Sequence, residues 1–213
     1  MCRNIKDHFW IERGVCVIPN ALPKEFTSRL HPDAEAAFGR QTILMLSSLK
    51  EYKGTREFIE LANRLPQYKF VLVINDVQEN IDPFLYKYNI FCSQNLIIYP
   101  RQNNVASFYN KATIVLNLSD KHRFVETFGL TALEAMSAGL PVIVPTEGGI
   151  AEMVTDGENG YKIDVQDLNK IVEYIHLLLS DQELYNKLSN NASAYSRNFN
   201  IDKMTESILS LFD

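Results

Sequence analysis

The alternation of short apolar runs with amphipathic stretches is the feature that most limits how this chain can fold. The apolar runs are rich in Val, Ile and Leu and show little polar alternation, which predicts strands covered on both faces. They are Val15–Pro19, Thr42–Ser47, Lys69–Asn75, Leu96–Tyr99, Ala112–Leu116, Pro141–Val144 and Tyr161–Ile163. The helical patterns are Thr55–Leu65, Ile81–Tyr88, Val105–Asn110, Gly129–Ala138, Ile150–Thr155, Val165–Leu179 and Gln182–Phe199. The pattern therefore predicts an α/β fold with a single, Rossmann-like, doubly wound parallel sheet, whose ligands bind beyond the carboxyl ends of the strands.

The two ends of the chain depart from this alternation and set the expected domain limits. Residues 1–40 contain a proline-flanked turn at residues 19–23 and then polar, alanine-rich sequence, so we expect a linker or strap there. Residues 41–199 form one predicted domain. Residues 200–213 predict a short amphipathic helix, which packs either on this domain or on something outside this chain.

Charge and cysteine content exclude several classes of function. The net charge is −5 and basic residues are scattered, so we expect no nucleic-acid partner. Three cysteines (Cys2, Cys16 and Cys92) lie far apart and the histidines are dispersed, which argues against a disulfide framework or a metal site. No apolar run has the length of a membrane span, and the first residues lack a signal-peptide core. We expect a soluble, cytoplasmic protein.

Two glutamates, Glu126 and Glu134, lie eight positions apart across a Phe128-Gly129 turn that opens a predicted helix. A helix N-terminus presents N–H groups and partial positive charge, which suits anionic or polyhydroxylic ligands. Carboxylates accept hydrogen bonds from sugar and ribose hydroxyls. Eight helical residues span about 12 Å, the scale of a ribose, a diphosphate and a hexose in a row. The alternative is a solvated helix face, but the turn before the helix and Gly139–Pro141 after it favour a binding site.

Three other loops carry candidate side chains or glycines beside this helix terminus. Lys53 precedes Gly54 at a predicted helix start, where its ammonium can reach a docked anion, and Lys50 lies in the same loop. The alternative is that both are ordinary exposed lysines. His122 and Arg123, in the loop of residues 117–125, approach the same terminus. Gly148 and Gly149 open another predicted helix and let backbone N–H groups face a diphosphate. Neither a P-loop nor a G-x-G-x-x-G motif is present.

Together these motifs resemble the C-terminal domain of retaining GT-B glycosyltransferases of the group-1 or family-4 type, which build capsule, lipopolysaccharide and related glycans. The resemblance covers about residues 15–199 and rests on Lys53-Gly54, E-T-F-G-L-T-A-L-E-A-M, A-G-L-P-V, E-G-G-I-A-E and D-G-E-N-G-Y. It implies the C-terminal half of a GT-B fold and a UDP- or GDP-linked sugar as the substrate. It also implies that no metal or other cofactor is needed, since lysine and helix termini stabilise the leaving group.

The resemblance also implies roles for individual residues. Glu126 contacts the transferred sugar near the reacting centre and Lys53 neutralises the diphosphate, so these two are the catalytic candidates. Glu134 binds the ribose hydroxyls. The other candidate donor contacts are Phe128, Gly129, Leu130, Ser48, Arg101, Gly148 and Gly149. Lys50, His122 and Arg123 are candidate phosphate or acceptor contacts.

This chain departs from the family pattern in two respects. Family members usually carry Gly-Arg where this chain has Ser47-Ser48, and the absence of that arginine removes a charge-assisted contact to the diphosphate. Either Lys50 or Arg123 replaces this arginine, or the donor binds more weakly or its leaving group is less well stabilised. The family's enzymes also have an N-terminal domain that binds the acceptor, and this chain begins at what resembles the interdomain linker. We therefore expect either a piece of a longer enzyme or a natural half that pairs with another polypeptide.

Three functions remain open on this basis. The first is the donor-binding half of a glycosyltransferase that transfers a hexose with retention to a glycan or lipid-linked acceptor, peripheral at the inner membrane face through the missing domain. The second is a sugar-nucleotide-binding or assembly module without turnover. The third is a GT-B-fold sugar-nucleotide epimerase. The motif that contains Glu126 and Glu134 is more similar to that of the transferases than to that of the epimerases. The base, the sugar, the acceptor and the linkage are not encoded in any motif we recognise.

Overall fold

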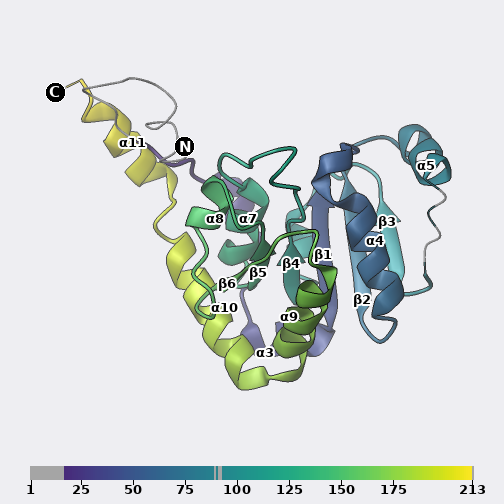
Figure 1. Cartoon of the computed structure of the whole chain (residues 1–213). Helices are drawn as coiled ribbons and strands as arrows, with labels where there is room; N and C mark the ends of the chain where they lie inside the picture. The colour runs from purple at the N-terminus through teal and green to yellow at the C-terminus, as the bar shows by residue number, and fades with distance from the viewer. Residues whose placement is uncertain (1–16, 89, 91–92, 213) are drawn as a thin grey trace.

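A computed structural model describes residues 17–88, 90 and 93–212 of the chain (Figure 1). Its centre is one sheet of six parallel strands in the order β3-β2-β1-β4-β5-β6. The strands are β1 (Thr42–Ser47), β2 (Lys69–Ile74), β3 (Leu96–Tyr99), β4 (Ile114–Leu116), β5 (Val142–Val144) and β6 (Gly160–Lys162). The chain moves outwards from β1 in one direction and then from β4 in the other, so the predicted doubly wound Rossmann-like sheet is confirmed.

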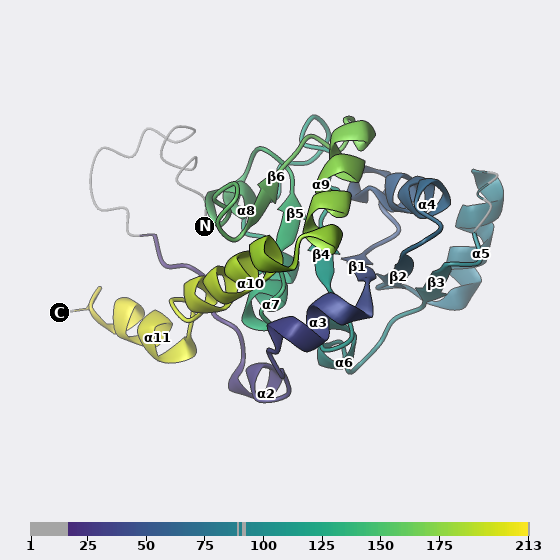
Figure 2. The same ribbon diagram turned by 90° about the horizontal axis from the view of Figure 1, so that it is seen from below.

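Helices cover both faces of this sheet. They are α2 (Lys24–Thr27), α3 (Ala34–Arg40), η1 (Glu51–Lys53, a 3₁₀ turn), α4 (Thr55–Arg64), α5 (Gln78–Lys87), α6 (Ala106–Tyr109), α7 (Leu130–Ser137), α8 (Gly149–Glu152), α9 (Leu168–Ser180), α10 (Gln182–Ser196) and α11 (Ile201–Leu209). In Figure 2, α4 and α9 lie on one side of the sheet, and α3, α6 and α7 lie on the other. Helix α10 packs against α3 and α7.

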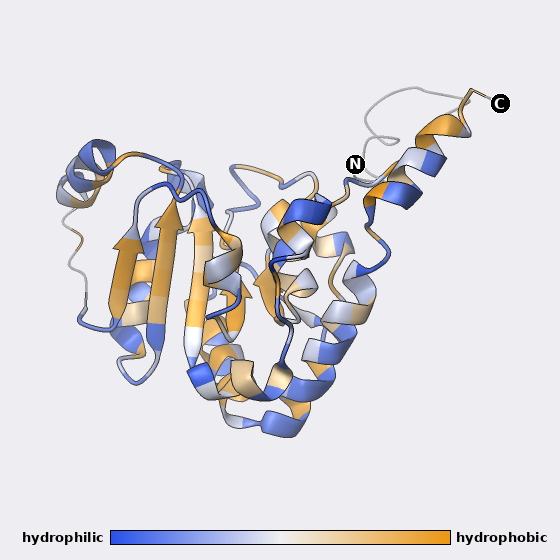
Figure 3. Cartoon of the chain, turned by 180° about the vertical axis from the view of Figure 1, so that it is seen from behind, coloured by the Kyte–Doolittle hydropathy of each residue, from blue (hydrophilic) through white to orange (hydrophobic). Residues whose placement is uncertain are grey.

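The strands form because their side chains are buried on both faces. Ile43, Leu44 and Met45 of β1 are each at most 1% exposed. Figure 3 shows hydrophobic residues along the strands and a mixture of hydrophobic and hydrophilic residues on the helices. Continuous apolar strands of this kind are stable only between two layers of helices, which explains why the apolar runs predicted the sheet.

The N-terminal segment differs from one expectation. Residues 15 and 16 of the predicted strand Val15–Pro19 lie outside the described residues, and residues 17–19 are irregular, so the strand prediction was wrong for the part described. Pro19 has no backbone N–H to donate to a neighbouring strand. The rest of the expected strap holds α2 and α3, and its Leu22 and Leu30 are buried against the domain. The division at residue 40 stays a prediction.

The C-terminal segment forms α11, which projects from the body of the molecule (Figure 1). This agrees with the predicted amphipathic helix, but no residue of α11 is buried, and Leu209 and Phe212 are 60% and 83% exposed. None of the helices in the described ranges combines the length and apolar character of a membrane span.

Candidate functional site

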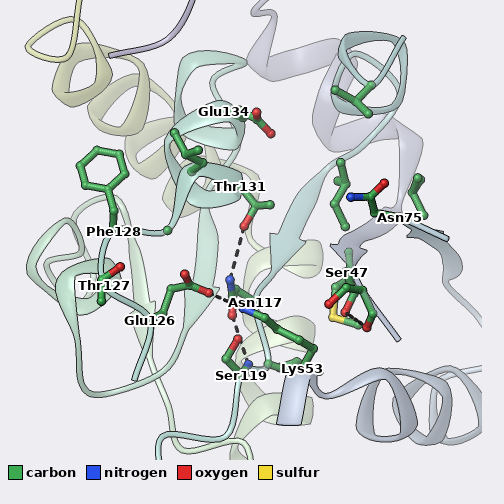
Figure 4. Close-up of a pocket in the computed structure, with 18 of the residues that line it drawn as sticks. Ser47, Lys53, Asn75, Asn117, Ser119, Glu126, Thr127, Phe128, Thr131 and Glu134 are labelled. Atoms are coloured by element: carbon green, nitrogen blue, oxygen red, sulfur yellow. Dashed lines mark hydrogen bonds and ion pairs between the residues drawn. The ribbon is translucent and has the colours of Figure 1, made fainter. Parts of the chain in front are cut away.

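A cavity of about 580 Å³ lies at the carboxyl ends of the first four strands (Figure 4). This is the edge predicted from the sheet topology, because the strand order reverses between β1 and β4. Its lining consists of Asn20, Met45, Leu46, Ser47, Ser48, Lys53, Val73, Asn75, Gln102, Val105, Asn117, Leu118, Ser119, Glu126, Thr127, Phe128, Gly129, Leu130, Thr131 and Glu134. The cavity therefore brings together Lys53, both predicted glutamates and the start of α7.

Lys53 and Glu126 form an ion pair at one side of the cavity. The Lys53 Nζ atom lies 2.6 Å from the Glu126 Oε2 atom, and the two side chains are 21% and 18% exposed. The Lys53 ammonium also lies 4.4 Å from the centre of the Phe124 ring, which stacks on Tyr52 at 4.8 Å. Lys53 follows β1 and Glu126 follows β4, so two neighbouring loops meet at this pair.

Glu134 lies in α7 at another part of the cavity. The Tyr109 hydroxyl donates a hydrogen bond of 2.5 Å to Glu134 Oε2. Burial raises the pKa of the Glu134 carboxyl, while this hydrogen bond acts in the opposite direction. A largely desolvated carboxylate with a fixed donor on one oxygen suits a ligand that offers hydroxyl groups to its remaining lone pairs.

The start of α7 is built for close approach of a ligand. Gly129 is its N-cap residue and has φ of +82°, in the left-handed region that favours glycine. A Cβ atom at Gly129 would lie 2.7 Å from the Ile150 Cβ atom, so a larger residue would displace α8. Gly129, Leu130 and Thr131 line the cavity, so the first N–H groups of α7 lie beside it.

A row of polar side chains in the cavity was not predicted. Asn117 Nδ2 donates to Thr131 Oγ1 at 3.3 Å, and the Ser119 backbone N–H donates to Asn117 Oδ1 at 3.1 Å. The Ser119 hydroxyl is buried beside them, and Asn75 lies across the cavity. Asn117 and Ser119 follow β4, Asn75 follows β2, and Thr131 lies in α7. The rule that ligands bind at the carboxyl ends of parallel strands could have indicated the first three.

Several predicted residues lie outside the cavity lining. Arg123 pairs with Glu51 at 3.1 Å, and His122 Nε2 lies 3.5 Å from Asp164 Oδ2, so both side chains are engaged elsewhere. Lys50 is exposed. Since neither Lys50 nor Arg123 lines the cavity, Lys53 is the single basic side chain of the lining within the described ranges.

Arg101 is exposed and does not line the cavity, but it contacts a residue that does. Its Nε atom donates to Asn75 Oδ1 at 2.8 Å, and Asn75 is a lining residue. The predicted role of Arg101 in donor binding therefore stays a prediction, and the structure gives it an indirect position.

Gly148 and Gly149 support the backbone that carries Glu126. A Cβ atom at Gly149 would lie 2.0 Å from the Thr127 carbonyl oxygen, and one at Gly148 would lie 2.4 Å from the Glu126 carbonyl oxygen. Both glycines thus allow α8 to approach the loop that holds Glu126. Neither glycine lines the cavity, and their predicted contact with a diphosphate stays a prediction.

The sequence profile described as "Glycosyl transferases group 1" matches residues 28–195. The chain belongs to this family. The match covers most of the described domain, including Lys53, Glu126 and Glu134, so the resemblance found from the motifs is confirmed at the level of the family.

Several curated proteins share modest sequence identity with this chain. An uncharacterized glycosyltransferase of Haemophilus influenzae is 28% identical over 88% of this chain and 51% of its own length. An N-acetyl-alpha-D-glucosaminyl L-malate synthase of Bacillus anthracis is 34% identical over 49% of this chain. An uncharacterized glycosyltransferase of Methanocaldococcus jannaschii is 26% identical over 95% of this chain and 54% of its own length. The chain spans at most about half the length of these relatives.

Solved structures agree on the fold. The C-terminal domain of the group 1 glycosyl transferase LpcC from Francisella tularensis superposes with a TM-score of 0.66 and 25% identity, covering 82% of this chain and 98% of that domain. A sucrose-phosphate synthase from Thermosynechococcus elongatus gives a TM-score of 0.77 at 21% identity, over 97% of this chain and 54% of that protein. The fold is therefore that of a GT-B C-terminal domain.

Proposed function

We propose that this chain is the donor-binding domain of a retaining glycosyltransferase that transfers a hexose from a nucleotide diphosphate sugar. One observation carries this proposal: Lys53, Glu126 and Glu134 line a single cavity at the N-terminus of α7. A cation and a helix terminus suit a diphosphate, and two carboxylates at different parts of the same cavity suit the hydroxyls of a hexose and a ribose.

The chemistry follows from these positions. The Lys53 ammonium and the N–H groups of α7 stabilise the negative charge that develops on the diphosphate as the bond from sugar C1 to oxygen breaks and its electron pair leaves with the diphosphate. The acceptor hydroxyl oxygen forms the new bond to C1 on the face that the diphosphate leaves, and its proton passes to the departing phosphate oxygen. When the donor binds, the ion pair between Glu126 and Lys53 breaks. Glu126 then accepts hydrogen bonds from the hexose. Glu134 accepts hydrogen bonds from the ribose. No metal takes part in this proposal.

The wider setting is also part of the proposal. The acceptor is a glycan or lipid-linked molecule bound by an N-terminal domain, as in surface polysaccharide or lipopolysaccharide synthesis. Residues 1–40 and 200–213 connect residues 41–199 to that domain, at the inner face of the membrane in the cytoplasm. By itself the chain binds the donor without completing transfer, so the binding-module alternative describes the isolated domain.

Calorimetric titration of this chain with nucleoside diphosphates tests the donor site. UDP is the first ligand to use, because a structure of similar fold, HepE from Anabaena, is described as a complex with UDP and glucose. GDP and the corresponding sugar nucleotides complete the set. We expect UDP or GDP to bind with a dissociation constant below about 1 mM, which corresponds to a binding free energy of about −4 kcal/mol. If neither binds at about millimolar concentration, the donor site is refuted.

Variants connect binding to the named residues. Lys53→Met should weaken binding of the nucleoside diphosphate about 10- to 100-fold while sparing the nucleoside, because a charge-assisted contact contributes about 1.5–3 kcal/mol. Glu134→Ala should remove the preference for the ribose diol over its 2′,3′-dideoxy analogue. Lys50→Met is the matched control for Lys53, since Lys50 belongs to the same loop but is exposed and outside the lining.

A further inference from the structure

Glu134 contacts a tyrosine, Tyr109, that does not line the cavity and that no part of the proposed mechanism uses. Tyr109 ends α6 and is 0% exposed. Its hydroxyl lies 2.5 Å from Glu134 Oε2 and 3.4 Å from the Thr131 carbonyl oxygen. A phenol has one proton to donate, so the nearer oxygen, that of Glu134, receives it.

We propose that Tyr109 is a positioning residue, which keeps the Glu134 carboxylate ionised and turned so that its remaining lone pairs face the cavity. The inference rests on the proposed function, because it states what Glu134 needs in order to accept hydrogen bonds from the ribose diol of a nucleotide. Tyr109 does not line the cavity, and it therefore acts on a ligand only through Glu134.

The need for such a donor follows from the burial of Glu134. Desolvation disfavours the charged form and raises the pKa of this carboxyl, and the Tyr109 hydrogen bond lowers it again. A neutral carboxyl group would present a proton on one oxygen in place of an acceptor lone pair. An ionised carboxylate with one oxygen fixed presents acceptors in one direction, which is the state that a diol requires.

Tyr109 is held in place as a permanent donor. The Phe26 ring of α2 meets the Tyr109 ring edge-on, with centroids 6.0 Å apart and an angle of 89°. Burial, together with the neighbouring Glu134, raises the pKa of the Tyr109 hydroxyl well above its usual value, so the proton stays on the phenol. Across the described ranges, Tyr109 is the titratable group that contacts Glu134, while Lys53 and Glu126 in the same cavity pair with each other.

The first test needs no ligand. Tyr109→Phe keeps the ring and removes the hydroxyl, and the pKa of Glu134 is measured by carboxyl-carbon NMR on protein labelled with ¹³C-glutamate. The carboxyl-carbon resonance of Glu134 is assigned as the one that disappears from the spectrum of the Glu134→Gln variant. We expect the pKa of Glu134 to be higher in Tyr109→Phe than in the unaltered chain. An unchanged pKa would overturn the proposal.

Tyr185→Phe is a matched control for general damage to the core. Tyr185 is also 0% exposed, and its hydroxyl donates to the backbone carbonyl of Thr113 at 2.8 Å, not to a carboxylate. Both variants should lower the unfolding midpoint by similar amounts, because each loses one buried hydrogen bond. The pKa of Glu134 should move in Tyr109→Phe alone; an equal movement in Tyr185→Phe would assign the effect to loosened packing.

The second test measures UDP binding by calorimetry between about pH 5 and pH 8. Tyr109→Phe should bind UDP about tenfold more weakly than the unaltered chain, with the larger loss at the acidic end, where Glu134 is protonated first. Unchanged affinity across this range would overturn the positioning role. If the unaltered chain binds no nucleoside diphosphate, the proposed function fails, and the NMR comparison alone then decides whether Tyr109 controls the ionisation of Glu134.

Discussion

Lys53 Nζ and Glu126 Oε2 lie 2.6 Å apart, although the two residues come from loops that are 73 positions apart in the chain. Each charge is largely shielded from water and offset by the other. A diphosphate that enters the cavity competes with Glu126 for the Lys53 ammonium, so the ion pair reduces the attraction of the empty cavity for anions.

Removing the charge of Glu126 should therefore separate binding from transfer. Glu126→Gln frees the Lys53 ammonium from its partner, and we expect UDP to bind at least as tightly as before by calorimetry. In the two-domain enzyme proposed above, the same variant should lose about 10²–10³-fold in the rate of transfer, the size of effect seen when one transition-state contact is lost. Retained transfer would refute the role assigned to Glu126, and clearly weaker UDP binding would contradict the competition between Glu126 and the diphosphate.

The second prediction concerns the packing of the glycine pair. In Gly149→Ala the new methyl group would lie 2.0 Å from the Thr127 carbonyl oxygen, so α8 and the Glu126 loop must separate. We expect a loss of about 1–3 kcal/mol in the free energy of unfolding, as for other overpacked sites, measured by denaturant titration.

Gly39→Ala provides the control for this substitution. Gly39 lies in α3, and apart from its chain neighbours and the backbone of its own helix no atom lies within 4 Å of the position its Cβ would occupy. Because alanine is the better helix former, Gly39→Ala should be neutral or stabilising by up to about 1 kcal/mol. A loss in Gly39→Ala as large as that in Gly149→Ala would show that the contact with Thr127 is not the cause.

Much of this arrangement could be predicted from the sequence, for a physical reason. Strands such as β1 and β2 are buried on both faces, so their apolar runs mark them within a residue or two. Lys53, Glu126 and Glu134 lie in motifs whose spacing along the chain is fixed by local turns and one helix. What the sequence did not predict depends on contacts between distant segments, as between Tyr109 and Glu134.

The loop of residues 117–125 shows the same limit. Its three consecutive basic residues look equivalent in sequence, but Lys121 pairs with Glu147 and Asp164, and Arg123 pairs with Glu51. These partners come from the loops after three other strands, and they decide which way each side chain points. Lys50 and Arg123 were therefore reasonable candidates for a second cation in the cavity, and neither reaches its lining.

The third prediction is that removing the charge of Glu134 raises the free energy of unfolding. Burial raises the pKa of Glu134 above the usual 4.5, so the folded chain holds this proton more tightly than the unfolded chain. The stability that this group contributes is present at low pH and is lost as the pH rises through 4.5 and then the folded pKa. Glu134→Gln should thus be more stable than the unaltered chain by about 1 kcal/mol near neutral pH.

Denaturant titrations of Glu134→Gln and the unaltered chain at several pH values check this sign. The difference in the free energy of unfolding should shrink as the pH falls toward the usual pKa of a glutamate. Glu183→Gln is the control, because Glu183 is an exposed residue in the first turn of α10 and should give no gain. An advantage of Glu134→Gln that grows at acidic pH would contradict the prediction.

The fourth prediction follows from the charge of the cavity, which holds one lysine and two glutamates. Ser48 lines the cavity after β1, so Ser48→Arg places a guanidinium where a diphosphate is proposed to lie. A planar, bidentate donor suits phosphate oxygens, and we expect UDP to bind about tenfold more tightly, with a steeper dependence on salt. Lys50→Arg changes a basic side chain outside the lining and should leave the affinity unchanged. If Ser48→Arg binds UDP no better than the unaltered chain while its unfolding midpoint is preserved, the phosphates do not lie beside Ser48, and the diphosphate must be placed elsewhere along α7.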